Sequence, residues 1–82
     1  MSWDDLKKAK KIVGTKQVAK AVEKGIVRKV YVAKDADQHI TDPLLRLCEE
    51  RGIQIEFVDS MLGLGRACGL NVGAASCGIL SQ

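Results

Sequence analysis

Hydrophobic residues recur every three to four positions in four segments of the chain and form shorter runs between them. A recurrence every three to four positions is typical of amphipathic helices. The expected helices start after Ser2, at Thr15 or Lys16, after Asp42 and after Ser60. Serine and aspartate at such positions accept hydrogen bonds from the free N–H groups of the first turn. Pro43 suits a first helical position because it needs no N–H partner there.

The runs between the helices are short, and β-branched, aromatic or small residues predominate in them. They predict extended segments at Ile12-Val13, Val30 to Ala33, Ile53 to Val58 and Ala75 to Leu80. Lys34 to Ile40 is expected to be a polar loop. The helices are expected to end at Gly25, Gly52 and Gly69. Strands that alternate with helices imply crossover connections, hence a largely parallel sheet covered on both faces. The expected fold class is therefore α/β, a three-layer α/β/α sandwich.

The composition agrees with one folded domain over residues 1–82, since 46% of the residues are hydrophobic and 28% are charged. No apolar stretch approaches the roughly 18–20 residues that span a bilayer. The chain begins with acidic residues and then turns basic, which is the reverse of a secretory signal. We therefore expect a cytoplasmic protein that does not interact with a membrane.

Charge is distributed unevenly along the chain. Residues 1–34 hold ten Lys and Arg against three acidic residues, whereas residues 35–82 hold three against seven. The first part therefore carries a net charge of +7 and the second −4. Such polarity indicates a polyanion partner on one side of the domain, although solvated helix faces would give the same pattern.

Two motifs raise the question of an enzyme. The segment from Gly63 to Gly69 spaces its glycines like a dinucleotide-binding fingerprint, but no acidic residue follows Asp59 to hold a ribose. The glycines are expected instead to permit close helix–sheet packing and a helix stop. Asp35, Asp37 and His39 could touch a divalent ion, but a solvated loop with a capping aspartate explains them more simply. We expect no catalytic residue, no metal and no cofactor.

The cysteines give no support to a metal site either. Cys48, Cys68 and Cys77 are separated by 20 and 9 residues, which matches no paired zinc-ligand pattern. Each has apolar neighbours in the sequence. We expect buried free thiols in a reducing compartment.

Four segments together resemble a known family. They are Gly14-Thr15-Lys16-Gln17-Val18-Ala19-Lys20, Val30-Tyr31-Val32-Ala33-Lys34-Asp35-Ala36-Asp37, Leu64-Gly65-Arg66-Ala67-Cys68-Gly69 and Leu70-Asn71-Val72-Gly73-Ala74-Ala75. In this order and spacing they are similar to the ribosomal protein L7Ae/L30e superfamily, above all to its short bacterial members. The resemblance covers nearly the whole chain, and the first and last segments are fairly specific when they occur together.

The resemblance implies a four-stranded mixed sheet and binding to kink-turn RNA, a bulged duplex with sheared G·A pairs. The residues it assigns to RNA are Gly14, Thr15, Lys16, Gln17, Lys20, Lys24, Arg28, Lys34, Leu70, Asn71, Val72, Gly73 and Ala74. We expect a ribosome- or ribonucleoprotein-associated protein that is a monomer when free. Kink-turn RNA, ribosomal RNA included, is the expected partner, and DNA is not.

The chain departs from the family pattern at three places. Many relatives carry Asn-Glu at the position of Lys16-Gln17, some carry a basic pair at Met61-Leu62, and an acidic residue is frequent at the position of Asn71. The alternative from another class is a protein-interaction adaptor that uses the acidic stretch from Asp35 to Asp59. A small nucleotide- or metal-binding enzyme is the third candidate.

Overall fold

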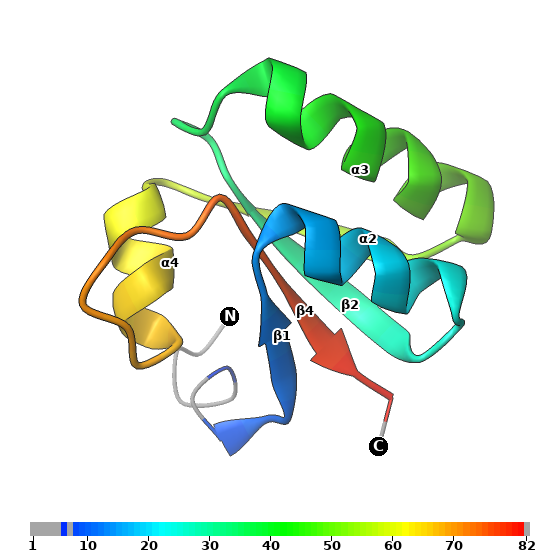
Figure 1. Cartoon of the computed structure of the whole chain (residues 1–82), viewed down its shortest axis with the longest axis horizontal. Coiled ribbons are helices and arrows are strands. Elements are labelled where there is room, and N and C mark those ends of the chain that lie inside the picture. Colours follow the sequence, from blue (N-terminus) through cyan, green and yellow to red (C-terminus); the bar gives the residue numbers. More distant parts are fainter. Residues whose placement is uncertain (1–5, 7, 82) are drawn as a thin grey trace.

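The computed structural model describes residue 6 and residues 8–81, which form a four-stranded sheet between helices (Figure 1). The elements are β1 (Lys11–Val13), α2 (Thr15–Glu23), β2 (Val27–Ala33), α3 (Gln38–Arg51), β3 (Gln54–Val58), α4 (Met61–Ala67) and β4 (Ser76–Leu80). The helix start predicted at Ser2 lies outside the described residues. The strands and helices otherwise follow the predicted order along the chain.

The sheet is mixed, with the strand order β1-β4-β2-β3. Strands β2 and β3 are parallel, whereas β4 is antiparallel to both β1 and β2. The largely parallel sheet expected from the alternation of elements is therefore wrong, and the mixed sheet implied by the family resemblance is confirmed. The reason lies after α4, where the chain returns to the start of that helix: the N–H of Ala74 donates to the carbonyl of Met61 at 2.9 Å. Strand β4 thus begins where β2 and β3 finish.

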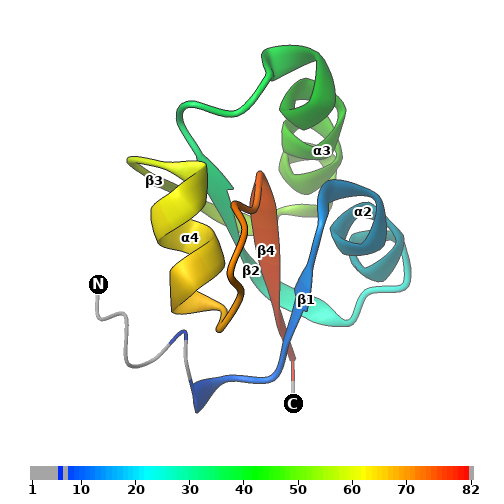
Figure 2. The ribbon, with the colours of Figure 1, turned by 60° about the vertical axis from the view of Figure 1, so that its left-hand side comes forward.

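Two apolar cores lie on opposite faces of the sheet, which confirms the three-layer sandwich. Helices α2 and α3 cover one face, where Val18 and Leu44 pack on Val30 and Val32 of β2. Helix α4 covers the other face, as the turned view shows (Figure 2). The core on that side is formed by Leu6, Tyr31, Ala33, Ala36, Val58, Leu64, Ala67, Ala74, Cys77 and Ile79.

Helix α3 begins earlier than the sequence predicted, so the expected start at Asp42 is wrong. The side chain of Asp37 accepts a hydrogen bond from the N–H of His39 at 2.8 Å, and the carbonyl of Asp37 accepts the N–H of Thr41 at 3.1 Å. A first turn is thus complete before Pro43, which lies inside the helix. The predicted loop of residues 34–40 accordingly ends before Gln38.

The other predicted helix ends agree with the structure. Ser60 caps α4, and its hydroxyl accepts the N–H of Gly63 at 3.0 Å. Gly52 ends α3 in the left-handed region at φ 68°, a conformation that costs glycine little. Local capping chemistry therefore fixes these boundaries.

Candidate nucleic-acid interface

The start of α2 leaves backbone donors open. Gly14 precedes the helix at φ 104°, and no side chain caps it. The first turn of a helix carries N–H groups that have no partner within the helix. Within residues 8–81, no acceptor is found for the N–H groups of Thr15, Lys16 and Gln17. These amides and the helix dipole make the start of α2 suitable for an anion.

The side chain of Thr15 is directed to another element instead of its own helix. Its hydroxyl lies 3.0 Å from the hydroxyl of Ser76, the first residue of β4, and Ser76 is fully buried. The N–H of Gly14 also donates to the carbonyl of Ser76, at 3.2 Å. The turn before α2 is therefore fixed to the end of the loop that precedes β4.

Polar side chains of α2 are exposed beside the open amides. Lys16 and Gln17 are both exposed at the first turn, and Lys20 is exposed one turn later on the side of Lys16. Side chains four residues apart lie on the same face of a helix. Two ammonium groups and one amide are thus available next to the helix start.

The loop of residues 70–74 is held against α4. The N–H of Leu70 donates to the carbonyl of Gly65 at 2.9 Å, near one end of the loop. A Cβ on Gly65 would collide with the carbonyl oxygen of Val72, and a Cβ on Gly73 would lie 3.1 Å from the Cβ of Met61. The glycine motif therefore permits close packing of helix on loop, where helix on sheet was expected. Gly69, at φ 81°, provides the expected helix stop.

The loop presents an apolar side chain outward. The side chain of Val72 is 66% exposed, and Asn71 and Gly73 are exposed as well. Leu70 is half-buried and Ala74 is buried, so the residues at the two ends of the loop face inward. The middle of the loop is the part that a ligand could reach.

The structure brings the start of α2 and the loop to the same end of the sheet (Figures 1 and 2). The hydroxyl pair of Thr15 and Ser76 joins them, and the N–H of Ala33 bonds the carbonyl of Ala75 at 2.9 Å. Lys34, which follows β2 at this end, is exposed and lies 3.9 Å from Asp59 in a loose surface ion pair. We call residues 14–17, 20 and 70–74 the platform.

Two of the residues assigned to RNA lie away from the end of the sheet that carries the platform. Lys24 is the C-terminal cap of α2, and Arg28 lies near the first residue of β2. Because α2 runs away from the platform and β2 runs toward it, both residues are at the opposite end of the sheet (Figure 1). Both follow Lys20 in the sequence, but the course of the chain carries them away from the start of α2.

Sequence reasoning also missed residues that position the platform. Ser76 was assigned only to a strand, although a hydroxyl at the start of an otherwise apolar strand is a signal for a buried hydrogen bond. The carboxylate of Asp35 accepts the N–H of Met61 at 2.8 Å, across 26 residues of sequence, and no local pattern indicates this bond.

The aspartates considered for metal binding accept hydrogen bonds from the chain's own backbone. The carboxylates of Asp35 and Asp37 accept first-turn N–H groups of α4 and α3. Among the described residues, no group of three or more His, Cys, Asp or Glu could hold a metal ion. Glu56 pairs with Lys29 at 2.8 Å, so the acidic stretch is partly occupied by the chain's own donors.

The three thiols are free. Cys48 and Cys77 are buried as expected, whereas Cys68 is only partly buried. Burial raises the pKa of the Cys48 thiol and of the Cys77 thiol, and contact with Cys68 raises the Cys77 pKa further. Both buried thiols therefore stay protonated and unreactive near neutral pH.

No helix in the described part of the chain is long and apolar enough to cross a bilayer.

Comparisons with known proteins agree on one family. The model of the ribosomal protein L7Ae/L30e/S12e/Gadd45 family matches residues 3–82. An RNA-binding protein of Bacillus pumilus is 46% identical over 81 residues, which are 98% of this chain and 99% of the relative. An RNA-binding protein of Caldanaerobacter subterraneus is 49% identical over 67 residues, 82% of each chain. The solved structure of a Giardia lamblia 15.5 kD RNA-binding protein superposes with a TM-score of 0.89 at 29% identity, over 98% of this chain and 71% of that one.

Proposed function

The chain belongs to the ribosomal protein L7Ae/L30e/S12e/Gadd45 family, and from this premise we propose that it is a non-catalytic RNA-binding protein that selects kink-turns. The names of its bacterial relatives and of the Giardia protein support RNA as the ligand class. The choice of kink-turn RNA rests on the shape and chemistry of the platform.

A regular RNA duplex offers little to a helix end. Its major groove is deep and narrow, so that side chains cannot reach the base edges. A sharp kink with a bulge opens this groove and exposes unpaired bases. A helix end can therefore reach base edges in the kinked form that the straight duplex hides.

The start of α2 supplies donors that fit an opened groove. The free N–H groups of residues 15–17 and the helix dipole suit phosphate oxygens. The ammonium of Lys16 can donate to O6 and N7 of guanine, and the amide of Gln17 can both donate and accept at a purine edge. Lys20, one turn later, would reach the phosphate backbone. Base contacts give the selectivity in this arrangement, and phosphate contacts give most of the affinity.

The loop of residues 70–74 supplies a different kind of contact. Val72 is an exposed apolar side chain beside the open helix end, and such surfaces pack against unstacked bases. The observation that carries the proposal is this combination: an uncapped helix start with exposed Lys16 and Gln17, joined through Thr15 and Ser76 to a loop with an exposed apolar tip.

A titration tests the selectivity. The protein is titrated into a kink-turn RNA, into a plain duplex of the same length and into a kink-turn whose G·A pairs are replaced by Watson–Crick pairs. We expect binding to the first to exceed the other two, because a ligand favours a conformer only by its differential affinity for it. Equal affinity for the kink-turn and the plain duplex would refute the proposal.

A further inference from the structure

Strand β2 contains an irregularity at its first residues. Its register with β4 shifts between Val27 and Lys29, so that Arg28 has no partner of its own. Val27 and Val30, three residues apart, both pack in the core beneath α2 and α3, whereas regular strand residues on one face are an even number apart. An extra residue of this kind is a β-bulge, and it re-aims the side chain that it carries.

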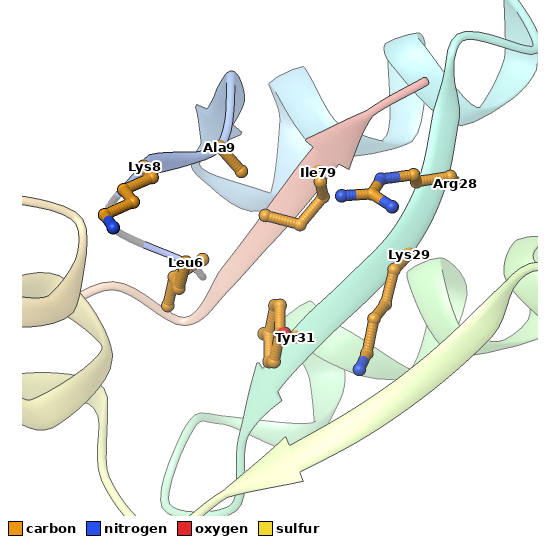
Figure 3. A pocket seen from close by; sticks show the side chains of 7 residues that line it. All are labelled: Leu6, Lys8, Ala9, Arg28, Lys29, Tyr31 and Ile79. Atoms are coloured by element: carbon orange, nitrogen blue, oxygen red, sulfur yellow. The ribbon is translucent and has the colours of Figure 1, made fainter. Parts of the chain in front are cut away.

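The bulge brings two basic residues to one side of the sheet. Tyr31 faces the core beneath α4, and Lys29, two residues before it, lies on that face too. With the extra residue in the strand, Arg28 also reaches that face. The guanidinium of Arg28 extends from β2 toward Ile79 of β4, and the ammonium of Lys29 points in another direction (Figure 3).

A cavity of about 390 Å³ lies at this place. It is lined by Leu6, Lys8, Ala9, Arg28, Lys29, Tyr31 and Ile79. Its size falls within the range of about 300–1,000 Å³ that is usual for sites of small ligands. Leu6, Ala9 and Ile79 give it an apolar wall, and basic side chains provide its polar groups. None of the described residues that line it is acidic.

The basic residues of the cavity differ in what they can offer. The ammonium of Lys29 is bound to Glu56 at 2.8 Å and lies 5.0 Å from the centre of the Tyr31 ring, so it is already paired. Arg28 and Lys8 are exposed, and neither has an ion-pair partner in the part of the chain that the structure describes. Among the described residues that line the cavity, the positive charge at the rim is therefore unbalanced, and Arg28 holds most of it.

We propose that this cavity is a second RNA contact, which binds one unpaired nucleotide of a strand that continues beyond the kink-turn. The guanidinium of Arg28 holds the phosphate and the sugar or base lies on the apolar wall, while Lys8 adds positive charge on the opposite side of the cavity (Figure 3). The inference rests on the proposed function. It gives Arg28 a role that its position away from the platform otherwise leaves unexplained.

The distance from the platform is compatible with one continuous strand. The longest extent of the described Cα trace is 29 Å. At about 3.4 Å per stacked nucleotide, ten nucleotides are enough to span it. A single-stranded extension of that length on either arm of the kink-turn can thus reach the cavity.

The test compares a bare kink-turn RNA with the same RNA carrying a ten-nucleotide single-stranded extension on one arm or on the other. We expect one extension to raise affinity about tenfold, which corresponds to one charge-assisted contact. The slope of log affinity against log salt should steepen by about 0.7, the value for one phosphate of a single strand. No gain from either extension would overturn the inference.

Variants separate the cavity from the platform. Arg28→Ala should remove most of the gain from the extension, Lys8→Ala should remove a smaller part of it, and both should leave affinity for the bare kink-turn unchanged. Arg51→Ala removes one exposed charge at the end of α3, on the opposite face of the sheet, and should keep the whole gain. If the cavity variants keep the gain as well, the strand binds elsewhere and the inference is wrong.

A free nucleotide is the other possible source of the same chemistry. NMR titration of the full chain with adenosine monophosphate, observed at Ile79 and Ala9, distinguishes the two. Saturation at micromolar concentration would make the cavity a nucleotide site and overturn the RNA assignment. Failure of this inference and failure of the proposed function remain distinct, because the bare kink-turn reports only on the platform.

Discussion

Three helices begin at the same end of the sheet, but the first turn of α2 differs from those of α3 and α4. Asp37 accepts an N–H group at the start of α3, and Ser60 and Asp35 accept two N–H groups at the start of α4. The start of α2 has no such side chain, and the hydroxyl of Thr15 binds that of Ser76 instead. The chain thus closes two helix starts with its own oxygens and leaves the third open.

The difference has an energetic meaning. Because the cap position of α2 is a glycine, the missing capping side chain costs this helix only about a few tenths of a kcal/mol. The capped starts of α3 and α4 contribute to the stability of the domain. The start of α2 lacks that contribution, and its N–H donors are available to an external anion.

Gly65→Ala should have the largest effect, because it disturbs the loop that lies beside the open start. The new methyl group would collide with the backbone of Val72, and backbone cannot move aside as a side chain can. We expect a loss of about 3 kcal/mol in the free energy of unfolding, measured by urea denaturation. Gly63→Ala is the control, since its Cβ meets only the Ser60 hydroxyl at 3.0 Å. Equal stability of the two variants would mean that the loop is not packed as described.

Lys16→Ala and Gln17→Ala change the open start without changing the core. Both side chains are exposed, so unfolding should be nearly unaffected. Each should lose about 1–3 kcal/mol of binding to a kink-turn RNA if it contacts a base edge. Fluorescence anisotropy measures the binding, and circular dichroism verifies the fold. If both variants bind as the parent does, the platform is not the RNA site.

Asp37→Ala removes the capping side chain of α3. It should lower the stability of the fold and leave RNA affinity unchanged, the reverse of what is expected for Lys16→Ala and Gln17→Ala. Removal of the carboxylate that accepts the N–H of His39 should cost about 1 kcal/mol of stability. Kink-turn affinity should stay the same, because α3 contributes no residue to the platform. Thermal unfolding and the same anisotropy assay give the two readouts. A loss of RNA affinity at unchanged stability would show that the distinction between open and closed starts is mistaken.

Lys20→Ala should have the smallest effect. A single exposed ammonium that meets a phosphate contributes less than about 1 kcal/mol at physiological salt. The salt dependence is more informative than the affinity: the slope of log affinity against log salt should fall by about one, equally for all RNAs tested. An unchanged slope would place Lys20 away from the backbone.

Capping residues and glycines made much of the fold predictable. Ser60 and Gly52 act within four residues of their own positions, so the sequence pattern contains their effect. Asp42-Pro43 failed as a helix start for a related reason. Asp37 offers an equally good cap five residues earlier, and the earlier start lets the helix bury Thr41. Local chemistry permitted both starts, and packing selected one.

The parts that could not be predicted depend on distant contacts. The direction of β4 follows from the return of the loop along α4, which requires the close approach of Val72 to Gly65. The position of Arg28 follows from the direction of β2 and from its bulge opposite β4. For the platform, the sequence indicated residues 14–17 and 70–74 through a resemblance, and only the coordinates reveal the hydroxyl of Ser76 that joins them.

The bond between Thr15 and Ser76 has a kinetic consequence. Because a buried partner holds the two segments in one arrangement before any ligand arrives, little conformational entropy remains to be lost on complex formation. Association should then proceed at similar rates for good and poor RNAs. Discrimination between them would be expressed in the lifetime of the complex.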